Sequence, residues 1–265
     1  MKKTPLFSLI LALALLAGCA AGGQDEAGST PTPPAESNSP SVPADAVEMT
    51  CRIVDGAEEG SLLLAEGADG PYGGTGIYTL SVGDIPVTVD GQSGGALTDG
   101  MLVTVCWNGM VAESYPCQLG EVYSLTASSE DTDDRCGLYL QVLADLWEVD
   151  PGLNESLEEL AVDFSQLTDL SESEKAALTW AFGSAHSLLP ITGTWDELVE
   201  QGYIDKENLV WNGSGCLFTL SGDAEGGFEA QKWASGLGAY FFGECTAEQS
   251  EDGSWTYTVG YEAIA

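Results

Sequence analysis

Basic side chains are scarce in this chain of 265 residues, which has seven Lys and Arg against 42 Asp and Glu and a formal charge of −35. A surface of this sign repels the phosphate backbone of nucleic acids and anionic lipid head groups. We therefore expect no nucleic acid among its partners. Cations, neutral glycans and basic peptides remain compatible with the charge.

Histidine is nearly absent, and the cysteines lack the spacing of a zinc site, because one histidine and no CxxC pair cannot supply four ligands. We interpret His186 as a residue in the last turn of a helix, where a positive charge interacts favourably with the helix dipole. The segment GQSGG at 91–95 matches G-x-S-x-G, but a nucleophile elbow needs a helix after the serine. A loop is predicted after Ser93, so we expect no hydrolase triad.

A second long apolar run is also lacking, and the first one is too short to span a membrane. A mostly apolar run of thirteen residues, 5–17, follows MKKT, and Gly18 and Cys19 complete the ending Leu16-Ala17-Gly18-Cys19. This ending resembles the bacterial lipobox, in which the cysteine thiol receives a diacylglycerol and becomes the new N-terminus. The resemblance implies a signal peptide at 1–18 and a lipid anchor at Cys19, on the extracytoplasmic face of the cell membrane. Residues 19–46 then form a tether rich in Pro, Ser and Gly.

Residues 47–128 contain short alternating segments bounded by Gly, Asp or Pro, which predict a small antiparallel β-barrel. In VTVCWNGMVAESYPCQL, at 103–119, the Asn108-Gly109 pair predicts a type I′ hairpin. Glu113 and Tyr115 then lie on its solvent face, where we consider them for ligand binding. The hairpin register predicts a core face made of Met101, Val103, Val105, Trp107, Met110 and Ala112.

The same stretch carries a family resemblance. GMLVTVCWNGMVAESYP, together with the lipobox and tether, resembles an OB-like domain of unknown function found in small Gram-positive lipoproteins. The resemblance covers about residues 47–127 and implies an OB-like barrel, a fold that often binds oligonucleotides or oligosaccharides. The matching residues are Val103, Val105, Gly109, Val111, Glu113, Ser114 and Pro116.

Residues 129–135 form an acidic linker, in which Asp131, Asp133 and Asp134 are weak calcium candidates. The glycine turn and the distal glutamate of an EF-hand loop are missing there. Residues 136–265 predict helices followed by an antiparallel meander, and capping boxes of Ser171 with Glu174 and of Thr194 with Glu197 mark the starts of two of these helices. The whole chain is therefore predicted to be α+β with two separately folding regions. The run KWASGLGAYFFGECTA near the end resembles an uncharacterised module of Gram-positive surface proteins.

Six cysteines follow Cys19, an even number, so disulfides are compatible with the sequence. Cys216 and Cys245 lie on strands that we expect to be neighbours, which makes them the candidate pair. Cys51 shares an apolar face with its alternate neighbours, and we expect it to be a buried thiol.

The sequence therefore favours a non-catalytic, membrane-anchored binding module of the cell envelope, with a neutral wall glycan, a peptide or another envelope protein as its partner. Two alternatives stay open. One is an envelope enzyme that uses carboxylates on glycan or peptide, and the other is a calcium-dependent adhesion module with calcium as its cofactor. Convergent carboxylates with raised pKa values in a pocket would favour the enzyme.

Replacing Cys19 with Ala should abolish lipid attachment, because alanine has no thiol to receive the diacylglycerol. Cells grown with an alkyne fatty acid should label the wild-type protein and the control variant Cys117→Ala, which keeps the lipobox, but not Cys19→Ala. Normal labelling of Cys19→Ala would show that the anchor is wrongly assigned.

Overall fold

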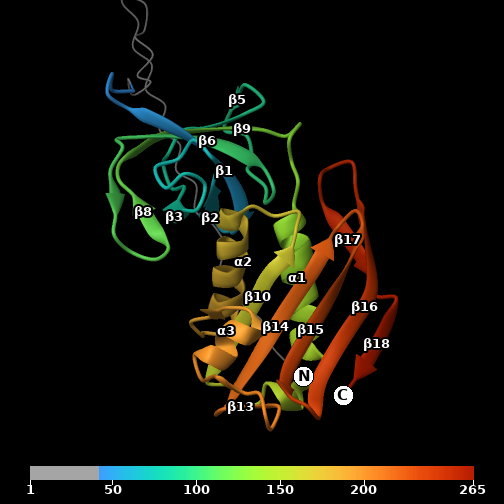
Figure 1. Cartoon of the computed structure of the whole chain (residues 1–265). Coiled ribbons are helices and arrows are strands. Elements are labelled where there is room, and N and C mark those ends of the chain that lie inside the picture. The colour runs from blue at the N-terminus through green and yellow to red at the C-terminus, as the bar shows by residue number, and fades with distance from the viewer. Residues whose placement is uncertain (1–41) are drawn as a thin grey trace, which may run out of the picture. The chain divides into compact units, whose positions relative to one another are not determined.

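In the computed structural model, which describes residues 42–265, strands account for 43% and helices for 17% of the residues (Figure 1). Eighteen strands form two nine-stranded sheets. The predicted α+β class is therefore wrong, and the described chain is mainly β. The predicted signal peptide, Cys19 and most of the tether lie outside the described residues.

The first sheet is a half-barrel with the strand order β5-β4-β9-β6-β1-β2-β3-β8-β7. Its two end strands, β5 and β7, do not pair with each other, so the closed N-terminal barrel that the sequence predicted does not form. The strands are β1 (Val47–Asp55), β2 (Ser61–Glu66), β3 (Ile77–Ser81), β4 (Val87–Val89), β5 (Gln92–Ser93), β6 (Leu102–Trp107), β7 (Val111–Ala112), β8 (Cys117–Leu119) and β9 (Val122–Ser128).

The predicted Asn108-Gly109 hairpin is also wrong, because β6 pairs with β1 and β9 whereas β7 pairs with β8. A type I′ turn needs positive φ at both central residues. Gly109 has φ 77°, but Asn108 does not adopt positive φ, and its side chain instead accepts a hydrogen bond from the Met110 N–H at 3.0 Å. The chain therefore continues from the end of β6 into a loop. Met110 is 65% exposed and Ala112 is exposed, while the other predicted core residues, Met101, Val103, Val105 and Trp107, are buried.

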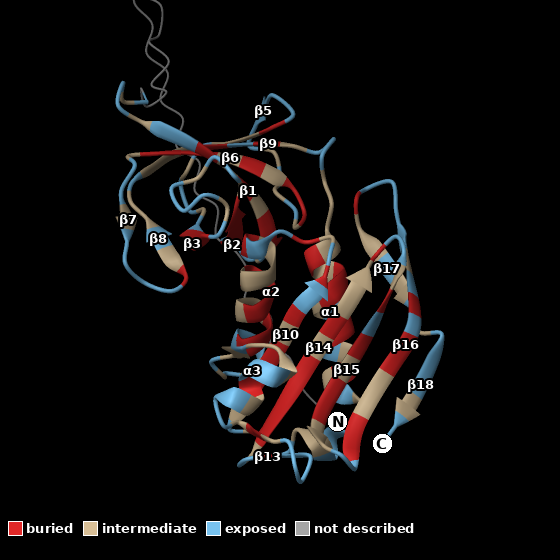
Figure 2. Cartoon of the chain, viewed as in Figure 1, coloured by how far each residue is buried: buried red, intermediate tan, exposed pale blue. Residues whose placement is uncertain are grey.

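Strand β2 is buried on both faces and joins the two halves of the described chain (Figure 2). Leu62 and Leu64 belong to the core of the half-barrel, whereas Leu63 and Ala65 pack with helices α1 (Arg135–Glu148) and α2 (Glu172–Ala185). Burial on both sides explains why the strand is a continuous apolar run and not an alternating one. The apolar core therefore continues across the acidic linker.

The second sheet is mixed. Strand β10 runs parallel to both of its neighbours, β11 and β14, and all other neighbouring strands of this sheet run antiparallel. Helices α1 and α2 cover one face, and α3 (Trp195–Glu200) packs with residues of the other. The strands are β10 (Glu159–Leu167), β11 (Ile191–Thr192), β12 (Ile204–Asp205), β13 (Val210–Trp211), β14 (Gly215–Asp223), β15 (Gly227–Ser235), β16 (Gly238–Gln249), β17 (Trp255–Thr258) and β18 (Tyr261–Ile264).

Polar contacts fix the start of α2 against the half-barrel. The Ser173 hydroxyl, which is fully buried, donates to the Glu66 carbonyl at 2.7 Å, and Arg52 lies 3.4 Å from the Glu174 carboxylate. The predicted capping box of Ser171 and Glu174 is confirmed at the same helix end. The N-terminus of α2 is therefore held by both its own cap and the neighbouring sheet.

The buried Glu66 carboxylate, 3% exposed, organises the glycine-rich loop that follows β2. It accepts hydrogen bonds from the Tyr72 N–H and the Tyr78 hydroxyl, each at 2.7 Å. A Cβ at Gly70 or Gly76 would overlap with this carboxylate, so these positions require glycine. The loop has few apolar residues, and its hydrogen bonds to this buried carboxylate hold it in place.

Lys232 on β15 is fully buried and caps the C-terminus of α1. Its Nζ donates to the carbonyls of Trp147, Val149 and Asp150, and to the Asn154 Oδ1 at 2.7 Å. Burial lowers the pKa of this ammonium group, while the carbonyls at the helix end satisfy its hydrogen-bond donors.

In contrast to the two separately folding regions that the sequence predicted, we expect that neither fragment 42–128 nor fragment 134–265 unfolds cooperatively alone, because each exposes its half of the core shared by β2 and α2. Thermal melts followed by circular dichroism should show broad changes for both fragments and one sharp transition for residues 20–265. Sharp transitions in both isolated fragments would show that the shared face contributes little to folding.

Candidate functional site

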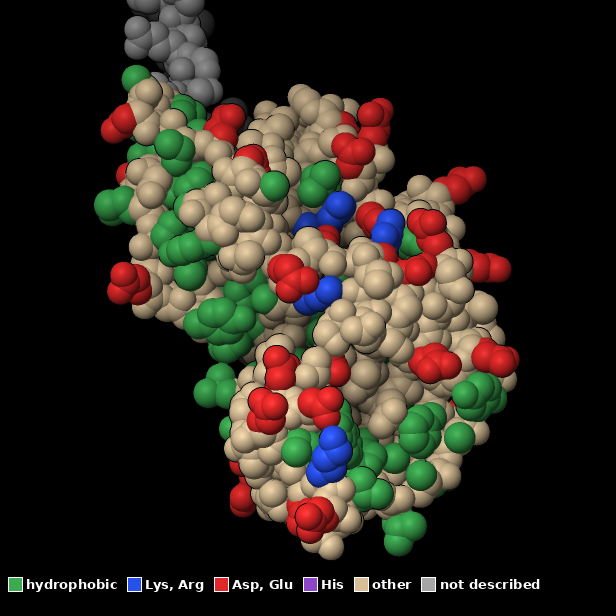
Figure 3. All heavy atoms as spheres, viewed as in Figure 1, with side chains coloured by type: hydrophobic (Ala, Val, Ile, Leu, Met, Phe, Trp, Pro, Cys, Tyr) green, Lys and Arg blue, Asp and Glu red, His purple; other side chains and the backbone are tan. Residues whose placement is uncertain are grey.

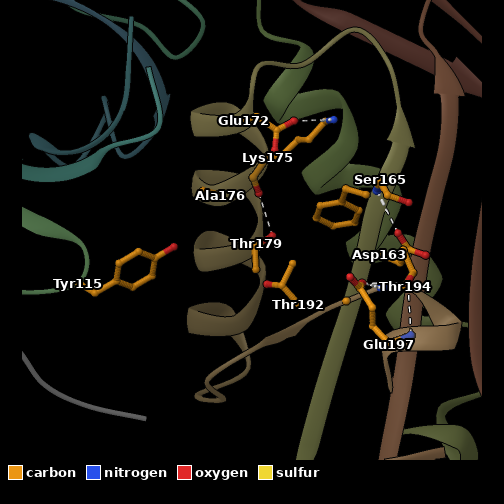
Figure 4. A pocket seen from close by; sticks show the side chains of 12 residues that line it. Tyr115, Asp163, Ser165, Glu172, Lys175, Ala176, Thr179, Thr192, Thr194 and Glu197 are labelled. Atoms are coloured by element: carbon orange, nitrogen blue, oxygen red, sulfur yellow. Dashed lines mark hydrogen bonds and ion pairs between the residues drawn. The ribbon is translucent and has the colours of Figure 1, made fainter. Parts of the chain in front are cut away.

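A cleft of about 410 Å³ lies where α2, the edge of the second sheet and the loop between β7 and β8 meet (Figure 4). Tyr115 reaches it from the loop, and the remaining lining comes from α2, β10, β11 and the start of α3. The lining residues are Tyr115, Asp163, Phe164, Ser165, Glu172, Lys175, Ala176, Thr179, Thr192, Gly193, Thr194 and Glu197.

Helix α2 contributes one face to the cleft. Glu172, Lys175, Ala176 and Thr179 follow the three- and four-residue spacing that aligns side chains along a helix. Lys175 Nζ lies 3.2 Å from the Glu172 carboxylate, and the Thr179 hydroxyl donates to the Lys175 carbonyl at 2.8 Å. The helix therefore presents an ammonium group, a carboxylate and a hydroxyl in a row.

An irregularity in β10 shapes the opposite wall. The register between β10 and β14 shifts between Asp163 and Gln166, as in a β-bulge. Such bulges change the direction of side chains near binding sites. Asp163 accepts a hydrogen bond from the Ser165 N–H at 3.0 Å, and both residues line the cleft.

The third carboxylate of the cleft, Glu197, belongs to the capping box of α3. It accepts hydrogen bonds from the N–H and the hydroxyl of Thr194, at 2.8 and 2.9 Å. Both bonds lower the pKa of Glu197, and the bond from the backbone N–H has the larger effect. This carboxylate is therefore ionised at neutral pH. With three acidic groups and one ammonium group, the cleft is negatively charged.

Of the two binding candidates from the sequence, only Tyr115 lines the cleft. Its ring is 64% exposed and contacts Trp180 of α2 edge-on, with 5.6 Å between ring centres and an interplanar angle of 84°. Glu113 is exposed on the same loop but is not part of the lining. The structure thus brings Tyr115 to a polar cleft of the second sheet.

The calcium candidates have other contacts. Asp133 lies 2.9 Å from the Arg135 Nε and accepts from the Trp255 indole N–H at 2.8 Å, and Asp134 caps α1 through the Gly137 N–H at 3.0 Å. The backbone carbonyl of Asp131 accepts from Arg52. Across residues 42–265, no group of three or more His, Cys, Asp and Glu side chains is arranged to hold a metal ion.

The cysteine candidates lie apart. Strand β15 separates Cys216 on β14 from Cys245 on β16, so the expectation that their strands are neighbours is wrong. Both are free buried thiols, and burial raises their pKa values to about 12 and about 11. Cys51 is a fully buried free thiol, as predicted.

His186 is the C-cap residue of α2 and stacks on Trp147, with 3.5 Å between ring centres. Burial lowers its pKa, which disfavours the charged form that the dipole interpretation requires. Ser93 lies on the two-residue strand β5, and a turn with Gly94 at φ 75° follows it where a nucleophile elbow would have a helix.

The surface retains the acidic character of the sequence. On the face shown in Figure 3, Asp and Glu side chains are widely spread and basic side chains are few. Among the described residues, none of the helices combines the length and apolar character that crossing a membrane requires.

No protein-family model, no curated protein and no solved structure matches the chain.

Burial, followed by repulsion from Asp99, Asp133 and Asp55, raises the pKa of Asp134 from 3.8 to about 6. The native state therefore binds this proton more tightly than the unfolded state. The resulting stability is fully present below about pH 4 and is lost as the pH rises through about 6.

The Asp134→Asn variant keeps a good N-cap but removes the buried charge, so it should raise the free energy of unfolding at pH 7.5 by about 2 kcal/mol. The gain should vanish below pH 4 in urea denaturation experiments. Asp90→Asn is the control, and it should instead lower the free energy of unfolding at pH 7.5. Hydrogen bonds from Ser129 stabilise the charged form of Asp90 and lower its pKa. A gain for Asp134→Asn that is independent of pH would contradict this account.

Proposed function

We propose that this protein is a lipid-anchored extracytoplasmic binding protein, which holds its ligand in the cleft between α2, β11 and Tyr115. The cleft itself is the observation that supports the proposal. An exposed aromatic ring, several hydroxyl groups and fixed charges converge there from separate parts of the chain. A concave site with a few convergent polar groups is the usual form of a ligand site.

The location outside the cell rests on the N-terminal sequence. The lipobox at Cys19 supplies the anchor, and a segment rich in Pro, Ser and Gly separates it in the sequence from the described part of the chain. The acidic surface is suited to ligands of the envelope that carry no phosphate, because such ligands escape the repulsion that a phosphate backbone meets.

Binding is favoured over carboxylate catalysis by the state of the acidic groups. A general acid of the glycosidase type needs a raised pKa, whereas the pKa of Glu197 is lowered by its bonds to Thr194. The carboxyl groups with raised pKa values, Asp99 and Asp134, do not line this cleft. The acidic groups of the cleft are thus suited to accept hydrogen bonds from a ligand.

The lining is compatible with the neutral wall glycans and peptides that the sequence analysis expects. Hydroxyl and carboxylate groups of Ser165, Thr179 and Asp163 provide hydrogen-bond partners for a polar ligand. The exposed Tyr115 ring offers an apolar face, and stacking on it requires no charge.

The Tyr115→Ala variant should weaken binding of soluble wall fragments at least fivefold, because it removes the only aromatic ring that lines the cleft besides Phe164. Isothermal titration calorimetry on residues 20–265 measures this change. Met110→Ala is the matched control, since Met110 is equally exposed near the same loop but does not line the cleft.

The control variant should bind within about twofold of the wild type. Binding unchanged by Tyr115→Ala would contradict the assignment of the cleft. Tight binding of single-stranded DNA that weakens as salt rises would contradict the ligand class, because it would show that phosphate neutralisation drives the interaction.

A further inference from the structure

One wall of the cleft is the open edge of a β-sheet. Strand β11 is the first strand in the order of the second sheet, and β10 is its sole partner within residues 42–265. Edge strands present unpaired backbone groups that another extended segment can use. The edge lies in the cleft, since Thr192 of β11 is exposed and belongs to the lining.

The register identifies which backbone groups point outward. Ala161 pairs with Ile191 and Val162 pairs with Thr192 in parallel orientation, and the Gly193 N–H donates to the Val162 carbonyl at 3.2 Å. In a parallel pair, alternate residues direct both backbone groups towards the neighbouring strand. Ile191 and Gly193 therefore face β10, and the N–H and C=O of Thr192 face away from it.

Helix α2 provides the opposite wall, so the cleft lies between a helix and a sheet edge (Figure 4). An extended peptide in such a groove forms backbone hydrogen bonds to the edge strand and places alternate side chains against the helix. Here the N–H and C=O of Thr192 supply one donor and one acceptor. Ala176 and Thr179 line the α2 wall of the groove with small side chains.

The charge of the cleft indicates which side chains a bound peptide would carry. Asp163, Glu172 and Glu197 line it against a single ammonium group, that of Lys175, which already pairs with Glu172. Asp163 and Glu197 lie on the side of β10 and α3, next to the edge strand. A bound strand that carries Lys or Arg side chains would therefore meet complementary charge.

We propose that the ligand of this cleft is an extended peptide segment with basic side chains, which adds to β11 as a further strand through the backbone of Thr192. This proposal rests on the proposed function and gives its ligand a chemical class. Tyr115 lines the same cleft, and its ring offers an apolar face to a side chain of the bound segment.

The probe is a capped hexapeptide of alternating valine and lysine, titrated into ¹⁵N-labelled residues 20–265 and followed by amide chemical shifts. The amides of Thr192, Gly193 and Thr179 should shift together at millimolar peptide. Two matched probes should bind at least tenfold more weakly: the valine–glutamate peptide, and a valine–lysine peptide with alternate amides methylated.

The decisive variant is Thr192→Pro, which removes the outward N–H and leaves the bonds to β10 intact, as proline permits on an edge strand. It should weaken binding at least tenfold. Thr192→Val keeps the N–H and changes only the side chain, so it should bind within twofold. Unchanged amide shifts elsewhere show that both variants are folded.

Equal binding by Thr192→Pro, by the glutamate peptide or by the methylated peptide would overturn strand addition. If wall fragments bind in a Tyr115-dependent manner while the valine–lysine peptide causes no shifts, the peptide proposal fails and the proposed function stands. If neither ligand perturbs the lining residues, both fail.

Discussion

The burial of β2 on both faces is the constraint on which the rest of the described structure depends. Its even-numbered leucines fill the half-barrel, and Leu63 and Ala65 pack against the helices that also cover the second sheet. Removing either neighbour would leave apolar surface in water at a cost of about 25 cal/mol per Å². Because β2 belongs to both cores, the two sheets depend on each other.

The cleft is a consequence of this arrangement. Contacts between α2 and the end of β2, above all the Ser173 hydroxyl on the Glu66 carbonyl, hold the helix beside the half-barrel. The β7–β8 loop of the half-barrel then reaches α2, where Tyr115 meets Trp180. Side chains that are already held in place by packed elements lose less conformational entropy when a ligand binds.

Local signals in the sequence predicted local structure well. The capping boxes at Ser171 and Thr194 mark the starts of α2 and α3, and the alternation in β1 predicted the buried Cys51. These features depend on residues close in the chain. Tyr115 was identified as a solvent-exposed side chain, which is correct, although the hairpin that supported this interpretation does not form.

Features that depend on distant residues were missed. The Asn-Gly pair favours a tight hairpin, but β6 pairs with β1 on one side and with β9 on the other. Strand β6 therefore has no free edge for β7, which pairs with β8. The two-residue strand β11 has no pattern long enough to recognise. The part of the lining that lies on α2 includes Glu172 and Lys175, and in the sequence these charged residues cannot be told from an ordinary solvated helix surface.

Native-state hydrogen exchange on residues 20–265 tests the central claim most directly, because it measures the free energy at which each segment opens. If β2 joins the two sheets into one core, the amides of β2, α2 and β14 should exchange through the same opening, with equal free energies and equal dependence on denaturant. Exchange of the half-barrel amides at a clearly lower free energy, while α2 and β14 stay protected, would contradict the account.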